Sequence, residues 1–262
     1  MFVLKIVGGL LCLYGAVCAV VYWIQEQLIF HPDPLERSFV FNFEADFEEL
    51  YIEVEDGIQL HALHFKASNS KGVVFYVHGN AGSLNDWGSL SDLYVEEGYD
   101  LFMFDYRGFG KSDGKITGEQ QFFDDVQQMY NYIRTLYDES TIIVQGFSIG
   151  TATATKIALD NNPQQLILKA PYYTLGYLIK SRHFYLPIGL LKYSFRTVNY
   201  LKQLRIPVTI FHGTIDELIP LENAKKLKAA VPNATLVVVE DCLHNDLPYT
   251  VIYKEKMHEL LA

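Results

Sequence analysis

The sequence predicts an α/β protein in which a mostly parallel central sheet has helices on both faces and follows one transmembrane helix. Two observations predict the sheet: short strands that are apolar throughout recur along the chain, and segments of helix length separate them. This pattern is typical of a parallel sheet covered on both faces. A third observation predicts the transmembrane helix, because the 19 residues from Ile6 to Ile24 carry no charge and about 20 apolar residues cross a bilayer.

The composition narrows the possible functions. Of the 262 residues, 50% are hydrophobic and 14% are aromatic, so the chain can bury a large core in one large domain or two small ones. The formal net charge of −10 argues against nucleic-acid binding, which needs Lys and Arg to neutralise phosphates. Cys12 and Cys18 lie in the apolar N-terminus and only Cys242 lies in the rest of the chain, which excludes an intradomain disulfide and a cysteine-bound zinc.

The apolar N-terminus is predicted to remain attached as a single-pass membrane anchor. Tyr22 and Trp23 end the apolar run, where amphipathic rings favour the membrane interface. A cleaved signal peptide is one alternative, because Val17-Cys18-Ala19 is a small-residue cleavage site, and a buried core helix is another. Lys5 precedes the run, so the positive-inside rule favours an N-terminus in the cytoplasm and a large domain on the non-cytoplasmic side.

An anchor of residues 1–27 is expected to lead into a catalytic domain of residues 28–262. His31-Pro32 and Asp33-Pro34 break helices and indicate an extended linker. Apolar and polar residues then alternate on both sides of Asp56-Gly57, a hairpin pattern in which this pair supplies the positive φ of the turn and which adds an antiparallel edge to the sheet. Apolar runs predict the other strands at 72–77, 100–105, 142–147, 165–171, 207–213 and 234–241.

Helices are predicted between these strands. Thr117 and Gln120 have capping-box spacing at the start of an amphipathic helix that continues to Tyr137. Residues 172–206, rich in Tyr, Phe, Leu and Lys, are expected to form a short helical insertion too small to be a separate domain. Further helices are expected at 88–98, after Ser148, at 221–231 and at 249–261.

The stretch GFSIG places Ser148 between Gly146 and Gly150, at the end of the strand of residues 142–147. Such a pattern arises by chance in about one chain in ten of this length, so its position decides its meaning. Reactive groups lie at the carboxyl ends of strands in sheets of this type, and three loops in that position hold a Ser, an Asp and a His in this order. The order is that of a serine hydrolase with Ser148 as nucleophile on a sharp turn.

His244 and Asp216 are the predicted base and acid. His244 follows the last strand in DCLHNDLP, where its loop can reach back over the sheet, and a base in this role predicts a rate that rises as His244 loses its proton. Asp216 stands in TIDELIP after the 207–213 strand, whereas the loop after the 165–171 strand holds no carboxylate. Weaker candidates are His183, His212 and His258 for the base and, for the acid, the turn residues Asp241 and Asp246 and the solvent-facing Glu217.

An oxyanion hole is predicted from two backbone N–H groups. One belongs to Ile149, the residue after the nucleophile. The other belongs to Asn80 in the loop HGNAG (78–82), with Ala81 as the fallback. Gly79 and Gly82 allow this loop to turn its N–H groups inward.

Together these motifs resemble those of the α/β-hydrolase family. The shared pieces are QEQLIFHP, HGNAG, DYRGFGKSDG, GFSIG, HGTIDELIP and HNDL, spread over nearly the whole chain. More narrowly, the chain resembles the membrane-anchored serine hydrolases related to α/β-hydrolase domain-containing protein 13. It resembles less closely the protein 17 branch, whose members are protein depalmitoylases. The resemblance implies a triad of Ser148, Asp216 and His244 and no cofactor.

The sequence therefore predicts a serine hydrolase that cleaves carboxylic esters or thioesters through an acyl-enzyme, acting on a small acyl ester or a lipid-like ester. Tyr172 and Tyr173 are the predicted substrate-binding residues, with Phe184, Tyr185, Leu186 and Phe195 as further candidates, and a core role fits each of them equally. A serine peptidase or amidase and a protein depalmitoylase are the alternative enzymes. Outside enzymes, the alternative is a membrane-tethered interaction protein on an inactive hydrolase fold.

Overall fold

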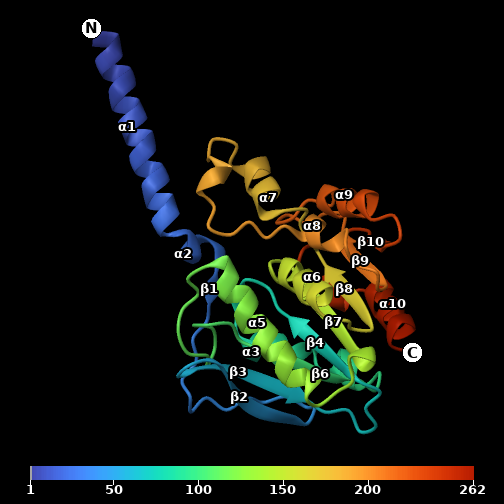
Figure 1. Ribbon diagram of the computed structural model, residues 1–262. Coiled ribbons are helices and arrows are strands. Elements are labelled where there is room, and N and C mark those ends of the chain that lie inside the picture. The colour runs from blue at the N-terminus through green and yellow to red at the C-terminus, as the bar shows by residue number, and fades with distance from the viewer. Residues whose placement is uncertain (1) are drawn as a thin grey trace.

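A parallel sheet with one antiparallel edge organises the molecule. The computed structural model describes residues 2–262 and places eight of its strands in the order β10-β9-β8-β7-β4-β6-β3-β2 (Figure 1). Their bounds are β2 (Phe47–Glu55), β3 (Ile58–Phe65), β4 (Val73–Val77), β6 (Asp100–Phe104), β7 (Ile142–Phe147), β8 (Gln165–Lys169), β9 (Val208–Gly213) and β10 (Thr235–Val239). All neighbours from β10 to β6 pair in parallel, so the predicted fold class is confirmed.

The predicted hairpin forms the antiparallel edge. β2 pairs with β3, and β3 pairs with β6, both in antiparallel register. Of the two turn residues only Gly57 has a positive φ, at 72°. The strands from β6 to β9, together with β4, are buried along their full length, which explains their continuous apolar runs.

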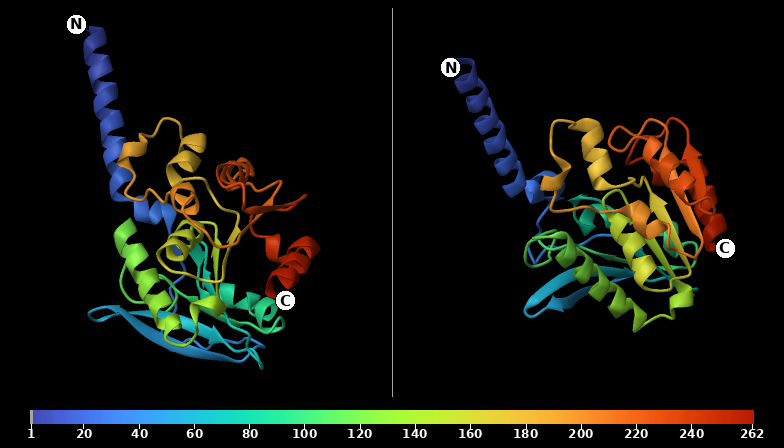
Figure 2. Two further views of the ribbon diagram at one scale, coloured as in Figure 1. Left: turned by 45° about the vertical axis from the view of Figure 1, so that its right-hand side comes forward. Right: turned by 45° about the horizontal axis from the view of Figure 1, so that its top comes forward.

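Helices cover both faces of the sheet, as Figures 1 and 2 show. One hydrophobic core lies under α5 (Glu119–Arg134), α6 (Gly150–Asp160), α8 (Thr197–Leu201) and α9 (Glu222–Ala230). A second core lies under α3 (Leu84–Trp87), α4 (Asp92–Val95) and α10 (Val251–Leu261). Because burial of apolar area contributes about 25 cal/mol per Å², these two layers are the main source of stability, and the strand ends are left for chemistry.

Two local predictions are wrong. The helix predicted at 88–98 is interrupted, because a 3-10 turn at Gly88–Leu90 separates α3 from α4. The capping box predicted at Thr117 is absent, since α5 begins only at Glu119 after an extended Gly118. The N–H of Thr117 instead donates to the side chain of Gln121. A capping box does begin α3, where Ser83 and Asp86 accept from each other's backbone N–H groups.

The N-terminal helix α1 (Phe2–Trp23) projects away from the rest of the molecule (Figure 1). Its length and composition suffice to cross a membrane, and only 6% of its most apolar 18-residue stretch is buried. The interpretation as a core helix is therefore wrong. An anchor and a signal sequence both fit this helix.

The segment after α1 is tied to the loop after β4 rather than forming a free extended linker. The short helix α2 (Gln25–Ile29) follows α1, and β1 (His31–Pro32) pairs in parallel with β5 (Ala81–Gly82) of the predicted oxyanion loop. Lys192 also pairs with Glu26 at 3.1 Å. The linker prediction is thus wrong for α2, because contacts with distant segments stabilise a helix there. The domain boundary at residue 27 stays a prediction.

Residues 172–206 form the predicted helical insertion, here called the cap. The cap connects β8 to β9 and contains α7 (Leu175–Arg182), a 3-10 turn (Ile188–Leu190) and α8. Figure 1 shows the α7 part of the cap beside α1. Because the cap starts at the carboxyl end of β8, it lies at the sheet edge where reactive groups are expected.

Candidate active site

Ser148 occupies a strained turn between β7 and α6. Its backbone φ is 52°, in the left-handed region that residues other than glycine rarely adopt. A Cβ added to Gly146 would lie 2.6 Å from the Cβ of Ala154, and one added to Gly150 would lie 2.3 Å from the carbonyl oxygen of Val77. The close approach of α6 to the sheet therefore accounts for both glycines of the motif.

Hydrogen bonds hold this turn from both sides. Thr151 donates to the carbonyl of Ser148 from its backbone N–H at 3.0 Å and from its hydroxyl at 2.6 Å. The N–H of Ser148 donates to the carbonyl of Lys169 at 3.0 Å, and the hydroxyl of Tyr172 donates to the carbonyl of Ile149 at 3.1 Å. The turn is thus fixed by both the helix and the neighbouring strand.

Asp216 and His244 lie together at the same edge of the sheet. The loop after β9 supplies Asp216 and the loop after β10 supplies His244. His244 Nδ1 and Asp216 Oδ2 are 2.7 Å apart. Asp216 Oδ1 accepts hydrogen bonds from the N–H groups of Leu218 at 2.9 Å and Ile219 at 2.7 Å. The carboxylate therefore has partners on both oxygens.

These partners favour the charged form of Asp216. Burial alone would raise the pKa of this carboxyl, but hydrogen bonds from His212, His244 and the Ile219 N–H outweigh burial and hold the pKa well below its usual range. His212 Nε2 lies 3.4 Å from Asp216 Oδ2 and 2.7 Å from the carbonyl oxygen of Ile219. A carboxylate that stays ionised can orient an imidazole and stabilise its cation.

The imidazole of His244 is buried against Phe147, with ring centroids 5.0 Å apart. Because Nδ1 faces Asp216, Nε2 is the nitrogen left for a nucleophile. Between residues 2 and 262, the Ser148 hydroxyl makes no hydrogen bond with this ring, so the structure joins Asp216 to His244 but not His244 to Ser148. Catalytic hydrogen bonds are often long in ligand-free enzymes and shorten with substrate bound.

The weaker acid candidates have other roles. Glu217 is exposed, yet its Oε2 also accepts the backbone N–H of His244 at 3.3 Å, so it does not simply face solvent. Asp241 has a φ of 52°, and Asp246 precedes the 3-10 turn Leu247–Tyr249. Both are turn residues, as expected.

The predicted oxyanion loop is held in place by the segment after α1. The side-chain amide of Asn80 donates to the carbonyl of Ile29 at 2.7 Å, and its backbone carbonyl accepts from the N–H of His31 at 2.7 Å. Within the described chain, the backbone N–H groups of Asn80 and Ile149 donate to no other residue. Free N–H groups are what an oxyanion hole requires.

The predicted substrate-binding residues are placed differently from one another. Tyr172 is 1% exposed and supports the nucleophile turn through its hydroxyl. Tyr173 is half-buried, and its ring packs against Tyr177 with centroids 5.7 Å apart. Phe184 and Tyr185 are exposed and line neither of the two cavities described next. A contact of Tyr172 or Tyr173 with substrate stays a prediction.

A cavity of about 350 Å³ adjoins the candidate triad. Its wall includes Ala81 and Gly82 of the oxyanion loop, Phe147 before the nucleophile, and Asn245 and Asp246 after the base. The other wall residues are Asp86, Trp87, Ser89, Leu90, Lys169, Pro248 and Tyr249. Mostly apolar walls with a few polar groups are typical of sites for organic ligands.

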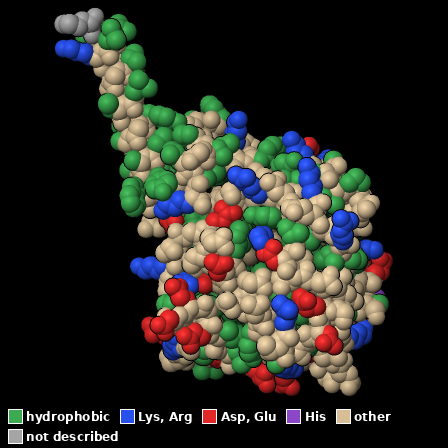
Figure 3. All heavy atoms as spheres, in the orientation of Figure 1, with side chains coloured by type: hydrophobic (Ala, Val, Ile, Leu, Met, Phe, Trp, Pro, Cys, Tyr) green, Lys and Arg blue, Asp and Glu red, His purple; other side chains and the backbone are tan. Residues whose placement is uncertain are grey.

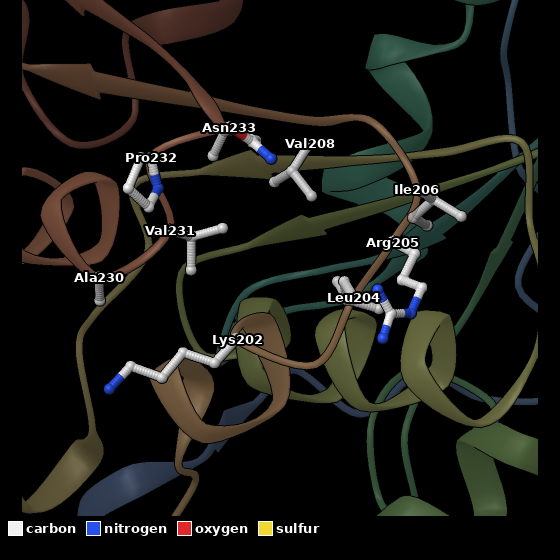
Figure 4. A pocket seen from close by; sticks show the side chains of 10 residues that line it. Lys202, Leu204, Arg205, Ile206, Val208, Ala230, Val231, Pro232 and Asn233 are labelled. Carbon is white, nitrogen blue, oxygen red and sulfur yellow. The ribbon is translucent and has the colours of Figure 1, made fainter.

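A second cavity, of about 360 Å³, lies at the opposite end of β9. Figure 4 shows Lys202 and Arg205 on the segment that leads into this strand, and Val231 on the segment after α9. Val208, the first residue of β9, is also part of its wall. The strand separates this cavity from Asp216, so it is not part of the candidate site.

Sequence reasoning missed two buried side chains near the site. Lys169 ends β8 at 1% exposure and lines the 350 Å³ cavity. Its signal was a single charge in the apolar run QLILKAP, because lysine is almost never buried without a partner. His212 is only a weaker base candidate in the sequence, and its contact with Asp216 depends on a turn that no local pattern shows.

Comparisons of the sequence identify relatives over the whole chain. The family model Hydrolase_4, described as serine aminopeptidase S33, matches residues 68–186, a range that includes Ser148 but neither Asp216 nor His244. The uncharacterized protein YfhR of Escherichia coli strain K12 is 26% identical over 279 residues, which cover 100% of this chain and 93% of that protein. The α/β hydrolase domain-containing protein 17C of Xenopus tropicalis is 28% identical over 203 residues, covering 74% of this chain and 62% of that protein.

Solved structures share the fold. An esterase from Pyrococcus furiosus aligns with a TM-score of 0.69 at 21% identity, covering 89% of this chain and 97% of the esterase. Est1E from Butyrivibrio proteoclasticus, with ferulic acid bound, aligns with a TM-score of 0.67 at 20% identity, covering 81% of this chain and 97% of that protein.

The sheet order and these matches define the fold as that of the α/β hydrolases. The chain is similar to α/β hydrolases in residues 68–186 and in its relatives of 26–28% identity. The narrower resemblance to the relatives of domain-containing protein 13 stays a prediction.

Proposed function

We propose that this chain is a serine esterase that cleaves small carboxylic esters or thioesters through an acyl-enzyme. The observation that carries the proposal is the 2.7 Å contact between His244 Nδ1 and Asp216 Oδ2, at the sheet edge where Ser148 occupies a strained turn. Such a pair turns a neighbouring serine hydroxyl into a nucleophile. The esterases that share the fold support an ester as the substrate.

In the first half of the reaction, Ser148 Oγ attacks the ester carbonyl carbon while His244 Nε2 takes the hydroxyl proton. The N–H groups of Ile149 and Asn80 stabilise the tetrahedral oxyanion. His244 then protonates the leaving oxygen or sulfur, and the bond from that atom to the carbonyl carbon breaks. An alcohol or thiol leaves, and the acyl group remains on Ser148.

Water completes the cycle. It attacks the acyl carbon and gives one proton to His244, which passes that proton to Ser148 Oγ as the carboxylic acid leaves. Asp216 remains ionised throughout and stabilises the imidazolium that forms twice per turnover.

A fluorophosphonate probe tests this proposal, because it forms a bond only with an activated serine. Wild-type protein should be labelled, whereas Ser148→Ala should not be labelled and should lose at least about 10³-fold in ester hydrolysis. Ser181→Ala, exposed in the cap, is the matched control and should behave as wild type. If the wild type is not labelled, or if Ser148→Ala is labelled equally, the better assignment is a membrane-tethered interaction protein on an inactive hydrolase fold.

A serine peptidase or amidase is the second candidate, because the matching family model is described as a serine aminopeptidase. Values of kcat/KM for p-nitrophenyl esters, a palmitoyl thioester and aminoacyl p-nitroanilides compare the three bonds directly. We expect the esters to be cleaved fastest. A clear preference for anilides would make the peptidase the better assignment, and one for the thioester would favour the depalmitoylase.

We further propose that α1 is an uncleaved single-pass anchor and that the catalytic domain lies on the non-cytoplasmic side. The exposed apolar surface of α1 supports the membrane span, and Lys5 before the apolar run supports the side. The Gln25 amide of α2 donates to the Leu190 carbonyl at 2.7 Å and joins the segment after α1 to the cap. The test is alkaline carbonate extraction, protease digestion of sealed cells, and N-terminal sequencing. Release by carbonate would contradict the membrane span. Protection from external protease would contradict the non-cytoplasmic side, and a new N-terminus near residue 20 would contradict the uncleaved anchor.

A further inference from the structure

A buried lysine without an anion lies beside the candidate active site. Lys169 is 1% exposed, and its ammonium lies over the rings of Tyr76, Phe147 and Tyr253 at 4.8, 5.1 and 5.6 Å from their centroids. Within residues 2–262 it has no carboxylate or hydrogen-bond partner, and burial lowers its pKa. Because lysine is almost never fully buried unless it is paired, a missing partner is the natural explanation.

The position of Lys169 shows where that partner would bind. Lys169 forms part of the wall of the 350 Å³ cavity, together with Gly82 of the oxyanion loop and Asn245 beside the candidate base. The hydroxyl of Tyr76, whose ring lies against the ammonium, also has no hydrogen-bond partner among the described residues. Buried polar groups are normally hydrogen-bonded. Of these two groups only Lys169 lines the cavity, so its ammonium points to an anionic ligand next to the triad.

The other wall residues narrow the chemistry of that ligand. Trp87 and Tyr249 provide aromatic surface for a hydrocarbon part. Asp86 and Asp246 are the carboxylates on the wall, and Asp86 Oδ2 already accepts the N–H of Ser83 at 3.1 Å. Neither carboxylate pairs with Lys169, so the ammonium is free for an anion from outside. An organic carboxylate supplies both the anion and the apolar body.

We propose that this cavity is a subsite for a carboxylate carried by the substrate, with Lys169 as its specificity-determining residue. The substrates would then be monoesters of dicarboxylic acids or esters of hydroxy acids. Folding has already desolvated the ammonium, so an incoming carboxylate gains the charge interaction without that cost being added again. The link to a substrate rests on the proposed esterase function, but the existence of the site does not.

The ionisation of Lys169 gives the subsite a pH dependence. Burial lowers the pKa of Lys169 to about 7. Burial raises the pKa of Tyr76 well above its ordinary value and that of Tyr253 to about 12, so both phenols facing the ammonium stay neutral. With Asp86 and Asp246 as the facing carboxylates, carboxylate binding should weaken as the pH rises from 6 to 9.

Fluorescence of Trp87, on the cavity wall, tests the subsite in the full chain carrying Trp23→Phe. The probes are butanoate and butanamide, which have the same shape and differ in charge. We expect butanoate to bind at least tenfold more tightly at pH 6, and this preference to disappear at pH 9. Lys169→Met should abolish the preference, whereas Lys156→Met, a control on α6, should keep it. Lys169→Gln serves as a second variant should Lys169→Met fail to fold.

Equal binding of the two probes to the unsubstituted cavity, no binding of butanoate, or a preference that survives in Lys169→Met would overturn the proposal. Fluorophosphonate labelling of the same samples separates the two hypotheses. If the protein prefers butanoate but is not labelled at Ser148, the subsite is supported and the esterase function is contradicted. If the protein is labelled but shows no preference for butanoate, the esterase function is supported and the subsite is contradicted.

A different observation concerns the cap tip, defined as residues 183–188. Phe184, Tyr185 and Ile188 are 83%, 54% and 42% exposed. Several large apolar side chains exposed together mark a contact surface rather than ordinary surface. Figure 3 shows hydrophobic side chains gathered where the lower part of α1 meets the body of the molecule.

The tip is attached to the middle of α1. The hydroxyl of Tyr14 donates to the carbonyl of Tyr185 at 2.6 Å. At the end of α1, the ammonium of Lys192 lies 5.9 Å from the ring centroid of Trp23, an arrangement suited to lipid headgroups. The nine residues from Tyr14 to Trp23 correspond to about 13 Å along a helix. This length is less than the half-thickness of the hydrocarbon core, about 15 Å, so with Trp23 at the interface Tyr14 lies within the same leaflet.

The backbone of the tip is only partly paired within the protein, because the N–H groups of Phe184 and Tyr185 have no partner among residues 2–262. The N–H of Leu186 donates to the carbonyl of His183 at 2.9 Å, and the carbonyl of Tyr185 accepts from Tyr14. Internal hydrogen bonds are required wherever water is absent. The long side chain of Lys180, in the last turn of α7, can reach back to the headgroups, whereas Arg182 donates to the carbonyl of Glu217.

We infer that the cap tip inserts into the leaflet of the membrane that holds α1, with lipid hydrocarbon as the occupant of its apolar surface. This inference rests on the proposed anchor and adds a second membrane contact, made by the catalytic domain itself. The cap would then bring the sheet edge next to esters dissolved in that leaflet.

Quenching of tryptophan fluorescence by lipids brominated along their acyl chains tests this inference in vesicles. In a background carrying Trp23→Phe and Trp87→Phe, which has no other tryptophan, Phe184→Trp should be quenched at least about twice as strongly as Leu136→Trp. Leu136 is a matched exposed position just past α5, whose far end points away from α1 (Figure 1). Equal quenching of the two would contradict the insertion. Trp23 in the wild type reports on α1. If Trp23 is quenched and Phe184→Trp is not, the membrane anchor is supported and only the insertion of the cap tip is contradicted.

Discussion

Two buried charges at the carboxyl ends of neighbouring strands are satisfied in opposite ways. Asp216, after β9, accepts hydrogen bonds on both carboxylate oxygens. Lys169, at the end of β8, is surrounded by aromatic rings and has no anionic partner in the described part of the chain. Burial works against charge at both residues, but hydrogen bonds hold the pKa of Asp216 well below its usual range, whereas burial lowers that of Lys169 to about 7.

The difference shows how one fold can assign two kinds of task to buried charges. A charge whose partners all come from the fold is fixed, which suits a residue that orients another residue in every turnover. A charge without partners lowers the stability of the free protein and is relieved only by a ligand, which suits recognition. Removing the first should therefore harm both stability and activity, and removing the second should raise stability.

The largest expected effect is on catalysis, through Asp216→Asn. An amide cannot hold His244 in the tautomer that leaves Nε2 free to accept a proton, and the same change in another triad lowers kcat by about 10⁴. Hydrolysis of a p-nitrophenyl ester measures this loss. Asp241→Asn, an exposed turn residue before His244, is the control and should change kcat less than about threefold. If both variants kept wild-type rates, the orienting role would have to pass to Glu217.

The next effect concerns stability and has the opposite sign, because Lys169→Met removes a charge that is unfavourable when buried. Since folding lowers the pKa of Lys169 to about 7, the folded protein releases this proton above pH 7 while the unfolded chain keeps it up to about pH 10.4. The destabilisation is therefore complete below pH 7 and is relieved as the pH rises.

Lys169→Met should accordingly raise the free energy of unfolding by on the order of 3 kcal/mol at pH 6, and by less at pH 9.5. Denaturant unfolding of the full chain in detergent measures both values. Lys156→Met should change them by less than about 0.5 kcal/mol. A variant less stable than wild type at pH 6 would show that the aromatic rings alone stabilise the ammonium.

A backbone change should separate the two residues of the Asp216–His244 pair. A Cβ on Gly213 would lie 2.1 Å from the carbonyl oxygen of Cys242, so Gly213→Ala should push apart the loops that carry the pair. We expect a loss of about 2 kcal/mol in stability together with reduced kcat. Gly189→Ala in the cap, where no atom lies within 4 Å of the added Cβ, should leave both unchanged. Equal effects of the two changes would mean that the loops are not closely packed.

The smallest effects compare two buried hydroxyls, one with a partner and one without. Tyr172→Phe removes a donor to the Ile149 carbonyl at 3.1 Å and should cost about 1 kcal/mol. Tyr76→Phe removes a hydroxyl that has no partner and should change stability by less than about 0.5 kcal/mol. Thermal unfolding of both variants checks the difference. A larger loss for Tyr76→Phe would reveal a partner, such as a bound molecule near Lys169.

The parts of the fold that could be predicted are those with a local physical signal. Buried parallel strands need continuous apolar runs, and the runs ending at Phe147 and Gly213 show this directly. The Asp56-Gly57 hairpin and the apolar α1 have equally local signals. The capping box failed because Thr117 has the right spacing in sequence but its N–H is taken by Gln121. Competition between partners cannot be read from spacing.

The candidate site divides in the same way. Ser148, Asp216 and His244 could be proposed because topology places the ends of parallel strands at one edge. The roles of His212 and Lys169 could not be proposed, since each depends on side chains from other strands and helices. The contact between Tyr14 and Tyr185 joins residues 171 positions apart, and no pattern within either segment predicts it.

By itself the sequence determined the class of fold, the apolar N-terminal helix and the order in which Ser148, Asp216 and His244 follow their strands. These features depend on hydrophobic periodicity and on residue type, which are local properties of the chain. Only the tertiary structure decided which buried charges have partners, which glycines separate backbones in contact, and that the cap reaches α1. Those features depend on distances between segments far apart in sequence, and packing alone sets such distances.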